Sequence, residues 1–296
     1  MKIPISLLFV SNIYQQFEEL LLLPRFKSAI CFLVSRLGCL SALQWAVKKG
    51  CPMDERTCTF AAAGGHLHVL QWARGQGCAW NEKTFSRAAS SGCLHVLQWM
   101  KSENCKWNAK TFSRAALFGH LHVLKWLLVH SCPWNEKVCS KAATNGHLHV
   151  LKWLRKNNCP WDEKTCSKAA AAGHLHVLKW ARLNRCPWNS DTLFEAAFNG
   201  HLHVLKWVVK QENCPIWNSW VLCSAASAGH LHVLQWAKQQ GNLAWNDGIW
   251  KEAASFGHVH ILQWANESNF VIDFEEIRKK AERNGHLHVL QWLSNM

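Results

Sequence analysis

Gly146-His147-Leu148-His149-Val150-Leu151-Lys152-Trp153 is one copy of an octapeptide that recurs along this chain. The tryptophans that close the copies are Trp45, Trp72, Trp99, Trp126, Trp153, Trp180, Trp207, Trp236, Trp264 and Trp292. The first six intervals between them are each 27 residues, and the last three are 29, 28 and 28. A repeat of this length is typical of stacked supersecondary units that are too small to bury an apolar face alone. The octapeptide therefore predicts a solenoid.

The repeat at residues 132–158 predicts two short helices. Asn135 is a good N-cap for a first helix over residues 136–144, which contain neither proline nor glycine. Gly146 ends that helix, because glycine tolerates the positive φ that a helix C-terminus often needs. A second helix follows over about residues 147–156, and the Asn-Asn-Cys-Pro sequence at 157–160 ends it. Each repeat is thus predicted to be a helix–turn–helix hairpin closed by a short loop.

The segment AATNGHLHVL, residues 142–151, resembles the ankyrin consensus AAxxGHLEVV. The ankyrin Thr-Pro-Leu-His tetrapeptide is absent, and each repeat is about six residues shorter than the usual 33. The chain therefore resembles the short ankyrin-like repeats without β-hairpins found in large DNA viruses, algae and other protists. This resemblance covers residues 25–296. It implies an all-α solenoid of about ten stacked repeats that binds a partner along the concave side lined by the first helices.

The chain divides into two parts. Residues 1–24 carry no repeat motif, so we expect an N-terminal segment or cap there, and residues 25–296 form the repeat solenoid. Residues 25–37 are predicted to be a degenerate first helix. The charged stretch at 274–283 suits a terminal capping helix, which needs a polar outer face. The apolar run at 3–10 is too short for a signal peptide or a membrane span.

Cysteine is abundant, with 14 residues, and it follows the repeat. One register contains Cys51, Cys78, Cys105, Cys132, Cys159 and Cys186, and a second contains Cys58, Cys139 and Cys166. No Cys-x-x-Cys pair occurs, which disfavours both zinc knuckles and a disulfide framework. We expect buried, reduced thiols and hence an intracellular protein of the cytoplasm or nucleus.

Histidine is the first candidate for a metal ligand, since 17 of the 18 histidines lie in the octapeptide. Residues two apart on a helix point in different directions. Equivalent residues of adjacent repeats are separated by about 8–10 Å, which is too far for one ion. We therefore expect no metal site, and we expect the first histidine of each motif to satisfy backbone groups near the turn.

Tryptophan forms two further registers, and 17 of the 19 residues belong to them. The second register, in the loops, contains Trp80, Trp107, Trp134, Trp161, Trp188, Trp217 and Trp245. Stacking on a sugar or a base is one interpretation. Burial between repeats is the simpler one, because each aromatic ring removes a large apolar area from water. Trp220 and Trp250 lie outside both registers, which makes them the better surface candidates.

Catalysis finds no support in the sequence. There is no glycine-rich phosphate loop, no GxSxG elbow and no HExxH motif. Each potential acid, base or nucleophile of the motif is copied about ten times, whereas an active site is needed once. We expect a protein that is not an enzyme, with no cofactor.

Positive charge follows the first helices, in a chain whose formal net charge is +14. Four pairs of like charge at i and i+4 each share one helix face: Lys83/Arg87, Lys110/Arg114, Lys137/Lys141 and Lys164/Lys168. Glu195 ends this pattern. Like charges four apart disfavour a helix slightly, so their repetition points to an acidic ligand. A further row, Lys125, Lys152, Lys179 and Lys206, belongs to the second helices and is expected on the opposite, convex side.

The residues before the glycine of each repeat vary, and they include Phe118, Asn145, Phe198 and Phe256. Aromatic residues at such positions could anchor a partner, or they could fill gaps under neighbouring helices. We expect a monomeric protein–protein interaction scaffold that binds an acidic partner through these residues and the basic pairs. The alternative is electrostatic, sequence-independent binding of nucleic acid by the basic face. We expect no membrane partner.

Overall fold

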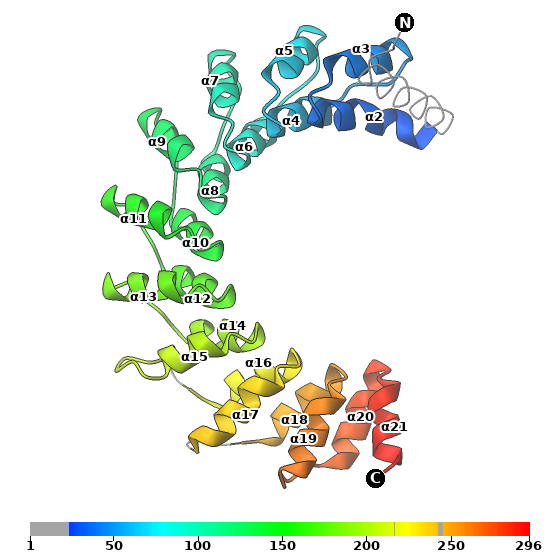
Figure 1. Cartoon of the computed structure of the whole chain (residues 1–296), viewed down its shortest axis with the longest axis vertical. Coiled ribbons are helices and arrows are strands. Elements are labelled where there is room, and N and C mark those ends of the chain that lie inside the picture. The colour runs from blue at the N-terminus through cyan, green and yellow to red at the C-terminus, as the bar shows by residue number, and fades with distance from the viewer. Residues whose placement is uncertain (1–23, 216, 242–244) are drawn as a thin grey trace, which may run out of the picture. The chain divides into compact units, whose positions relative to one another are not determined.

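The computed structural model describes residues 24–215, 217–241 and 245–296. These residues form twenty helices, α2 to α21, and no strand (Figure 1). The expected N-terminal segment lies outside the described residues except for Pro24, which begins α2. No helix in the described part of the chain is long and apolar enough to span a membrane.

Each repeat contributes two helices, so that even labels mark first helices and odd labels mark second helices. The first helices are α2 (Pro24–Arg36), α4 (Glu55–Ala63), α6 (Glu82–Ser90), α8 (Ala109–Leu117), α10 (Lys137–Thr144), α12 (Glu163–Ala171), α14 (Asp191–Phe198), α16 (Ser219–Ser227), α18 (Asp247–Ser255) and α20 (Phe274–Asn284). The second helices are α3 (Leu40–Lys48), α5 (Leu67–Gly75), α7 (Leu94–Ser102), α9 (Leu121–Val129), α11 (Leu148–Lys156), α13 (Leu175–Leu183), α15 (Leu202–Val208), α17 (Leu231–Gln240), α19 (Val259–Glu267) and α21 (Leu287–Ser294). The predicted all-α, hairpin-less repeats are confirmed for the described residues.

Contacts within the chain divide it into two units, residues 1–138 and 139–296. In the first unit, α4 packs between the first helices α2 and α6, and α6 also packs on α8. In the second unit the same succession runs from α12 through α14, α16 and α18 to α20. Each second helix packs mainly on the first helix of its own repeat, as α5 does on α4. Stacking of neighbouring repeats therefore builds the core of each unit.

N-cap side chains mark where several of the first helices begin. The side chain of Asn81 accepts hydrogen bonds from the backbone N–H groups of Lys83 and Thr84, at 2.9 and 3.4 Å. Asn135, expected as a cap, accepts one from the N–H of Lys137 at 3.2 Å. These bonds satisfy donors that have no partner inside the helix. They also set the register of every side chain that follows.

Both histidines of the motif bind the preceding repeat. The Nε2 atom of His120 donates to the carbonyl of Ser90 at 2.9 Å, and that of His122 donates to Gly92 at 2.9 Å. The same pair of bonds recurs at other repeats of both units, as at His258 and His260. The backbone role expected for the first histidine is confirmed, and the second histidine shares it.

Short aliphatic side chains make up the core of both units. Val96 and Leu97 of α7 are completely buried, and so are the alanine pairs of the first helices, such as Ala88 and Ala89. The expectation that the tryptophan registers form the core is wrong for most members, which are only half-buried. In the octapeptide, Trp236 is the one member below a tenth exposed among the described residues.

Eleven of the 14 cysteines are buried and all 14 are free. Cys78, for example, directs its Sγ to the carbonyl oxygen of Asp54 at 3.0 Å, and Cys186 directs its own to Asp162 at 3.5 Å. Both bonds run to the N-cap residue 24 positions earlier. The expected buried thiols are confirmed, and they join the loops of successive repeats.

Candidate binding surfaces

The first-helix face consists of the exposed side chains of the even-numbered helices. On α6 and α8 it includes Lys83, Arg87 and Lys110, which are exposed, and Arg114, which is half-buried. Because α6 packs directly on α8, these four cations lie on neighbouring helices of the first unit. Lys137 begins α10 and is also exposed. The basic residues predicted for this unit are therefore exposed or half-buried on successive first helices.

The second unit carries the other predicted cations, Lys141, Lys164 and Lys168. The first two are exposed, whereas Lys168 is half-buried. Its ammonium group forms an ion pair of 2.7 Å with Glu195 of α14. The change of sign at Glu195, which the sequence showed as the end of the basic pattern, is thus a contact between adjacent first helices. Lys168 is less available to a partner than its neighbours.

The varied residues before each glycine are exposed. Phe118, Phe198 and Phe256 are 44%, 53% and 57% exposed, and Asn145 is exposed as well. Each phenylalanine lies at the C-terminal end of a first helix, where the backbone turns toward the glycine. Of the two interpretations that the sequence left open, gap-filling under neighbouring helices is therefore disfavoured for these three rings.

The two tryptophans outside the registers behave differently. Trp220 is 70% exposed on α16, as expected of a surface residue. Trp250 is only 2% exposed, so the surface prediction is wrong for it. Trp250 lies three residues before the alanine pair of its helix, as Leu193 and Leu222 do in theirs. Both of those leucines are completely buried. The ring of Trp250 stacks on Trp245 at 5.7 Å. Counting back from the alanine pair would have identified Trp250 as a core residue.

A shallow cavity of about 260 Å³ lies between α14 and α16. Asp191, Phe194, Glu195, Phe198 and Ser224 line it. Trp220 is on the same helix as Ser224, four residues earlier, and shares its face. This part of the first-helix face is aromatic and acidic, whereas Lys164 on α12 is basic at the register of Asp191 and Trp220. Asp191 and Phe194 were not among the residues predicted from the sequence. The position that Asp191 shares with Lys164 and Trp220, five residues before the alanine pair, can nevertheless be read from it.

The second helices of the second unit carry a separate set of cations, which we call the second-helix face. It includes the exposed Lys152, Lys179, Lys206 and Lys210, together with Arg155 and Arg182. The guanidinium carbons of these two arginines lie 4.3 and 4.2 Å from the ring centroids of Trp161 and Trp188. The loop tryptophans thus support cations at the surface, a role that the sequence interpretation as core did not foresee.

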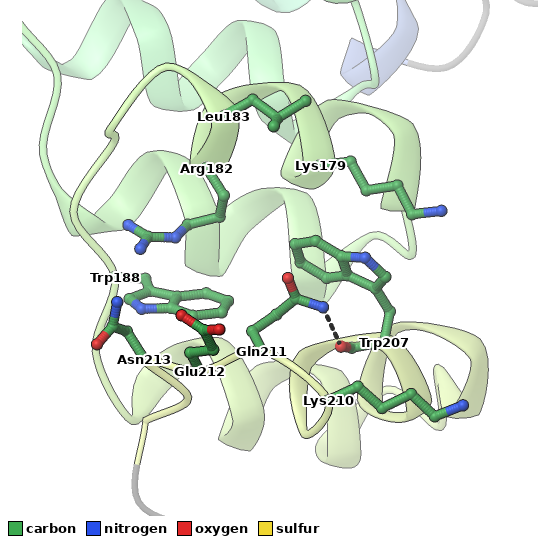
Figure 2. Close-up of a pocket in the computed structure, with 9 residues that line it drawn as sticks. All are labelled: Lys179, Arg182, Leu183, Trp188, Trp207, Lys210, Gln211, Glu212 and Asn213. Carbon is green, nitrogen blue, oxygen red and sulfur yellow. Dashed lines mark hydrogen bonds between the residues drawn. The ribbon is translucent and has the colours of Figure 1, made fainter.

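A cavity of about 430 Å³ lies on this face, between the ends of α13 and α15. Figure 2 shows Arg182 over Trp188, with Trp207 across from them and Lys179 and Lys210 extending toward one side. The ring centroids of Trp188 and Trp207 lie 6.1 Å apart. Glu212 is the acidic residue of the lining. The arrangement can bind an anion and a flat ring, because it combines cations with fixed aromatic planes.

Metal binding and nucleophilic chemistry have little basis in these surfaces. Among the described residues, no cluster of three or more His, Cys, Asp or Glu side chains could hold a metal ion. Burial raises the pKa of the thiols of Cys31, Cys105 and Cys132 to about 12. These thiols stay protonated at neutral pH, and the protonated form is a poor nucleophile.

No protein-family model matches the chain, and no curated protein matches it. Among solved structures it is similar to the pentatricopeptide repeat protein PPR10 in complex with an 18-nt psaJ RNA element, with 11% identity and a TM-score of 0.44. That match covers 94% of this chain and 48% of the other, so this chain spans about half of the PPR10 chain. The chain is also similar to the human ASB11 ankyrin repeat domain, with 16% identity and a TM-score of 0.43 over 53% of this chain and 83% of that one.

The repeats themselves define the class of protein. Each consists of two helices joined by a turn at glycine. In eight of the ten repeats a histidine follows that glycine, and it binds the carbonyl of the repeat before it, as His120 does. The chain is a helical repeat protein. Stacked repeats of this kind present extended surfaces.

Proposed function

We propose that this chain is a non-enzymatic scaffold that holds another protein on its first-helix face. The observation that carries the proposal is the contrast between buried and exposed positions of the first helices. Four residues before the alanine pair of the first helix, the buried residue is repeatedly threonine, as in Thr84, Thr111, Thr165 and Thr192. At the position before it the exposed residue changes along the chain, from Lys83, Lys110 and Lys164 to Asp191 and Trp220. The surface of a partner protein is irregular, so binding it requires exposed side chains that differ from repeat to repeat, as these do.

The chemistry of the face suggests how a partner would be held. On the first unit the proposed contacts are Lys83, Arg87, Lys110, Arg114, Phe118 and Lys137, which favour an acidic partner surface. On the second unit they are Lys141, Asn145, Lys164, Lys168, Phe198 and Phe256. Exposed aromatic rings next to charged side chains are typical of interface hot spots. The partner is therefore expected to combine acidic groups with apolar anchors.

Charge reversal tests the basic part of this face. Arg114→Glu with Lys141→Glu is expected to abolish capture of the partner in a pull-down, because it replaces attraction by like-charge repulsion. Helicity and Tm should change little, since Lys141 is exposed and Arg114 is half-buried. Undiminished capture by the folded double variant would refute the basic residues as the binding surface.

Truncation of aromatic side chains tests whether the aromatic residues of the first-helix face anchor the partner. Phe198→Ala with Trp220→Ala should weaken binding of the captured partner by roughly tenfold or more, as hot-spot truncations do. Val129 and Val271 are 79% and 88% exposed and lie off the first helices, so Val129→Ala with Val271→Ala is the matched control. Titration calorimetry with the purified partner measures both. Equal weakening by the two double variants would contradict the assignment.

The alternative function is electrostatic binding of nucleic acid by the same basic face. It is favoured by the like-charge rows on α6 and α8, and it predicts an affinity that falls steeply with salt. Filter binding across a salt titration distinguishes it from protein binding. Negligible binding of DNA and RNA at every salt concentration would remove this alternative.

A further inference from the structure

Charges repeat along the second-helix face as they do along the first-helix face, but on the second-helix face arginine–tryptophan pairs lie beside them. Lys152 in α11, Lys179 in α13 and Lys206 in α15 occupy the same register, 27 residues apart, and all three are exposed. A row of identical cations matches a ligand whose own anionic groups repeat along a chain, such as a phosphate backbone.

Flat cationic planes accompany two of these lysines. The guanidinium of Arg155 lies over Trp161 and also donates to the carbonyl of Cys159, and Arg182 makes the same contacts with Trp188 and Cys186. Each guanidinium is held by a ring on one side and by a backbone oxygen at its edge. Such a plane needs no reorganisation to stack a planar ligand.

The cavity of Figure 2 shows how the two features combine. Lys179, Arg182 and Lys210 are three cations of the lining and Glu212 is its one acidic residue, so the lining carries an excess of positive charge. The Trp207 indole forms a second wall, and the Nε2 atom of Gln211 donates to the carbonyl of Trp207 at 3.0 Å. At about 430 Å³ the space is comparable to the pockets that hold small ring-bearing ligands.

We propose that the second-helix face of the second unit binds single-stranded nucleic acid, with phosphates on Lys152, Lys179 and Lys206 and bases against the arginine–tryptophan pairs. A duplex keeps its bases stacked inside and cannot use these planes. An acidic peptide would pair with the lysines and leave the planes unused. A single strand uses both features, and its site lies on other helices than the proposed protein-binding face.

The first experiment compares two variants that lose the same charge. Fluorescence anisotropy measures binding of a labelled oligouridine of about 15 nucleotides to the full chain, to Lys152→Gln/Lys179→Gln/Lys206→Gln, and to the control Lys27→Gln/Lys48→Gln/Lys106→Gln. All six lysines are exposed, so both triple variants should fold. The first triple variant should weaken binding by about tenfold or more and lower the salt slope by about 2, whereas the control should retain both values. Equal losses in the two variants, or no binding at low salt, would overturn the proposal.

The second experiment changes the ligand. An abasic strand of the same length keeps the phosphates and lacks the rings, and stacking contributes about 1–3 kcal/mol for each base. The abasic strand is therefore expected to bind the full chain at least about fivefold more weakly than oligouridine. If the abasic strand or polyphosphate bound as tightly as oligouridine, the assignment to nucleic acid would be overturned. The face would then be a site that binds any polyanion. Neither result bears on capture of a protein by the first-helix face, so the two proposals fail separately.

Discussion

At the scale of single residues, the glycine that ends each first helix is fixed by two separate constraints. Gly92 has a φ of +74°, a region that is strained for residues with a Cβ. A Cβ added there would lie 2.7 Å from Nδ1 of His120, whose ring belongs to the next repeat. The same ring donates to the carbonyl of Ser90. Glycine and histidine therefore recur together because each depends on the space that the other leaves.

Two glycine-to-alanine substitutions separate the backbone strain from the clash with the histidine ring. Gly77 follows the second helix α5 and meets no histidine, whereas Gly92 meets His120. Gly77→Ala places a Cβ at a φ of +80° with no atom within 4 Å, so it should cost only the backbone strain, about 1–2 kcal/mol. Gly92→Ala should cost about 1 kcal/mol more, because it also displaces the His120 ring and breaks its hydrogen bond. Urea unfolding of the two variants measures the difference. Identical stabilities would mean that the ring moves without loss.

At the scale of the helix pair, burial of histidine rings between repeats makes the stacking sensitive to pH. Burial lowers the pKa of His174 and of His230, although the backbone bond of each ring acts in the other direction. The folded state therefore favours the neutral rings. Their contribution to stability is complete above the unfolded pKa of about 6.5 and is lost as the pH falls below it.

The Tm is accordingly expected to fall between about pH 7 and pH 5. His174→Gln with His230→Gln is the matched test, because a glutamine amide can donate to the same carbonyls but does not titrate in this range. The double variant should show a smaller fall in Tm over that interval than the parent chain. An unchanged fall would assign the pH dependence to other groups. Differential scanning calorimetry at the two pH values provides the measurement.

At the scale of the whole molecule, stacking hides nearly all of the sulfur chemistry. Cys39 is the one exposed cysteine, Cys93 and Cys214 are half-buried, and the other eleven are buried. A thiol reacts through its thiolate and needs access to the reagent. Burial suppresses both conditions, and it raises the pKa of Cys105 and Cys132 to about 12.

A thiol titration with Ellman's reagent should therefore occur in separate phases. The native chain is expected to show one fast thiol, two slower ones and no further reaction, and all 14 cysteines should react in denaturant. Cys39→Ser should remove the fast phase alone. Several fast thiols in that variant would indicate that the repeats open locally on the time scale of the reaction.

Much of the architecture could be predicted from local sequence signals. Asn135 and Gly146 mark the ends of the first helix of their repeat, and the octapeptide marks the second helix. These signals are local because caps and turns depend on backbone groups a few residues away. The exposure of the tryptophans could not be predicted in the same way. Equivalent residues of adjacent repeats are neighbours whether they lie in the core or on the surface. The repeat period alone therefore does not show whether a tryptophan is buried or exposed.

The sequence by itself determined that the chain is a stack of helical hairpins, where each hairpin begins and ends, and which registers carry charge. Only the tertiary structure decided that Lys168 pairs with Glu195, that most tryptophans of the two registers are half-buried, and that Arg182 lies over Trp188. The physical reason is range. Hydrogen bonds of caps and turns close within one repeat, whereas burial and pairing of side chains depend on the helices that a neighbouring repeat places beside them.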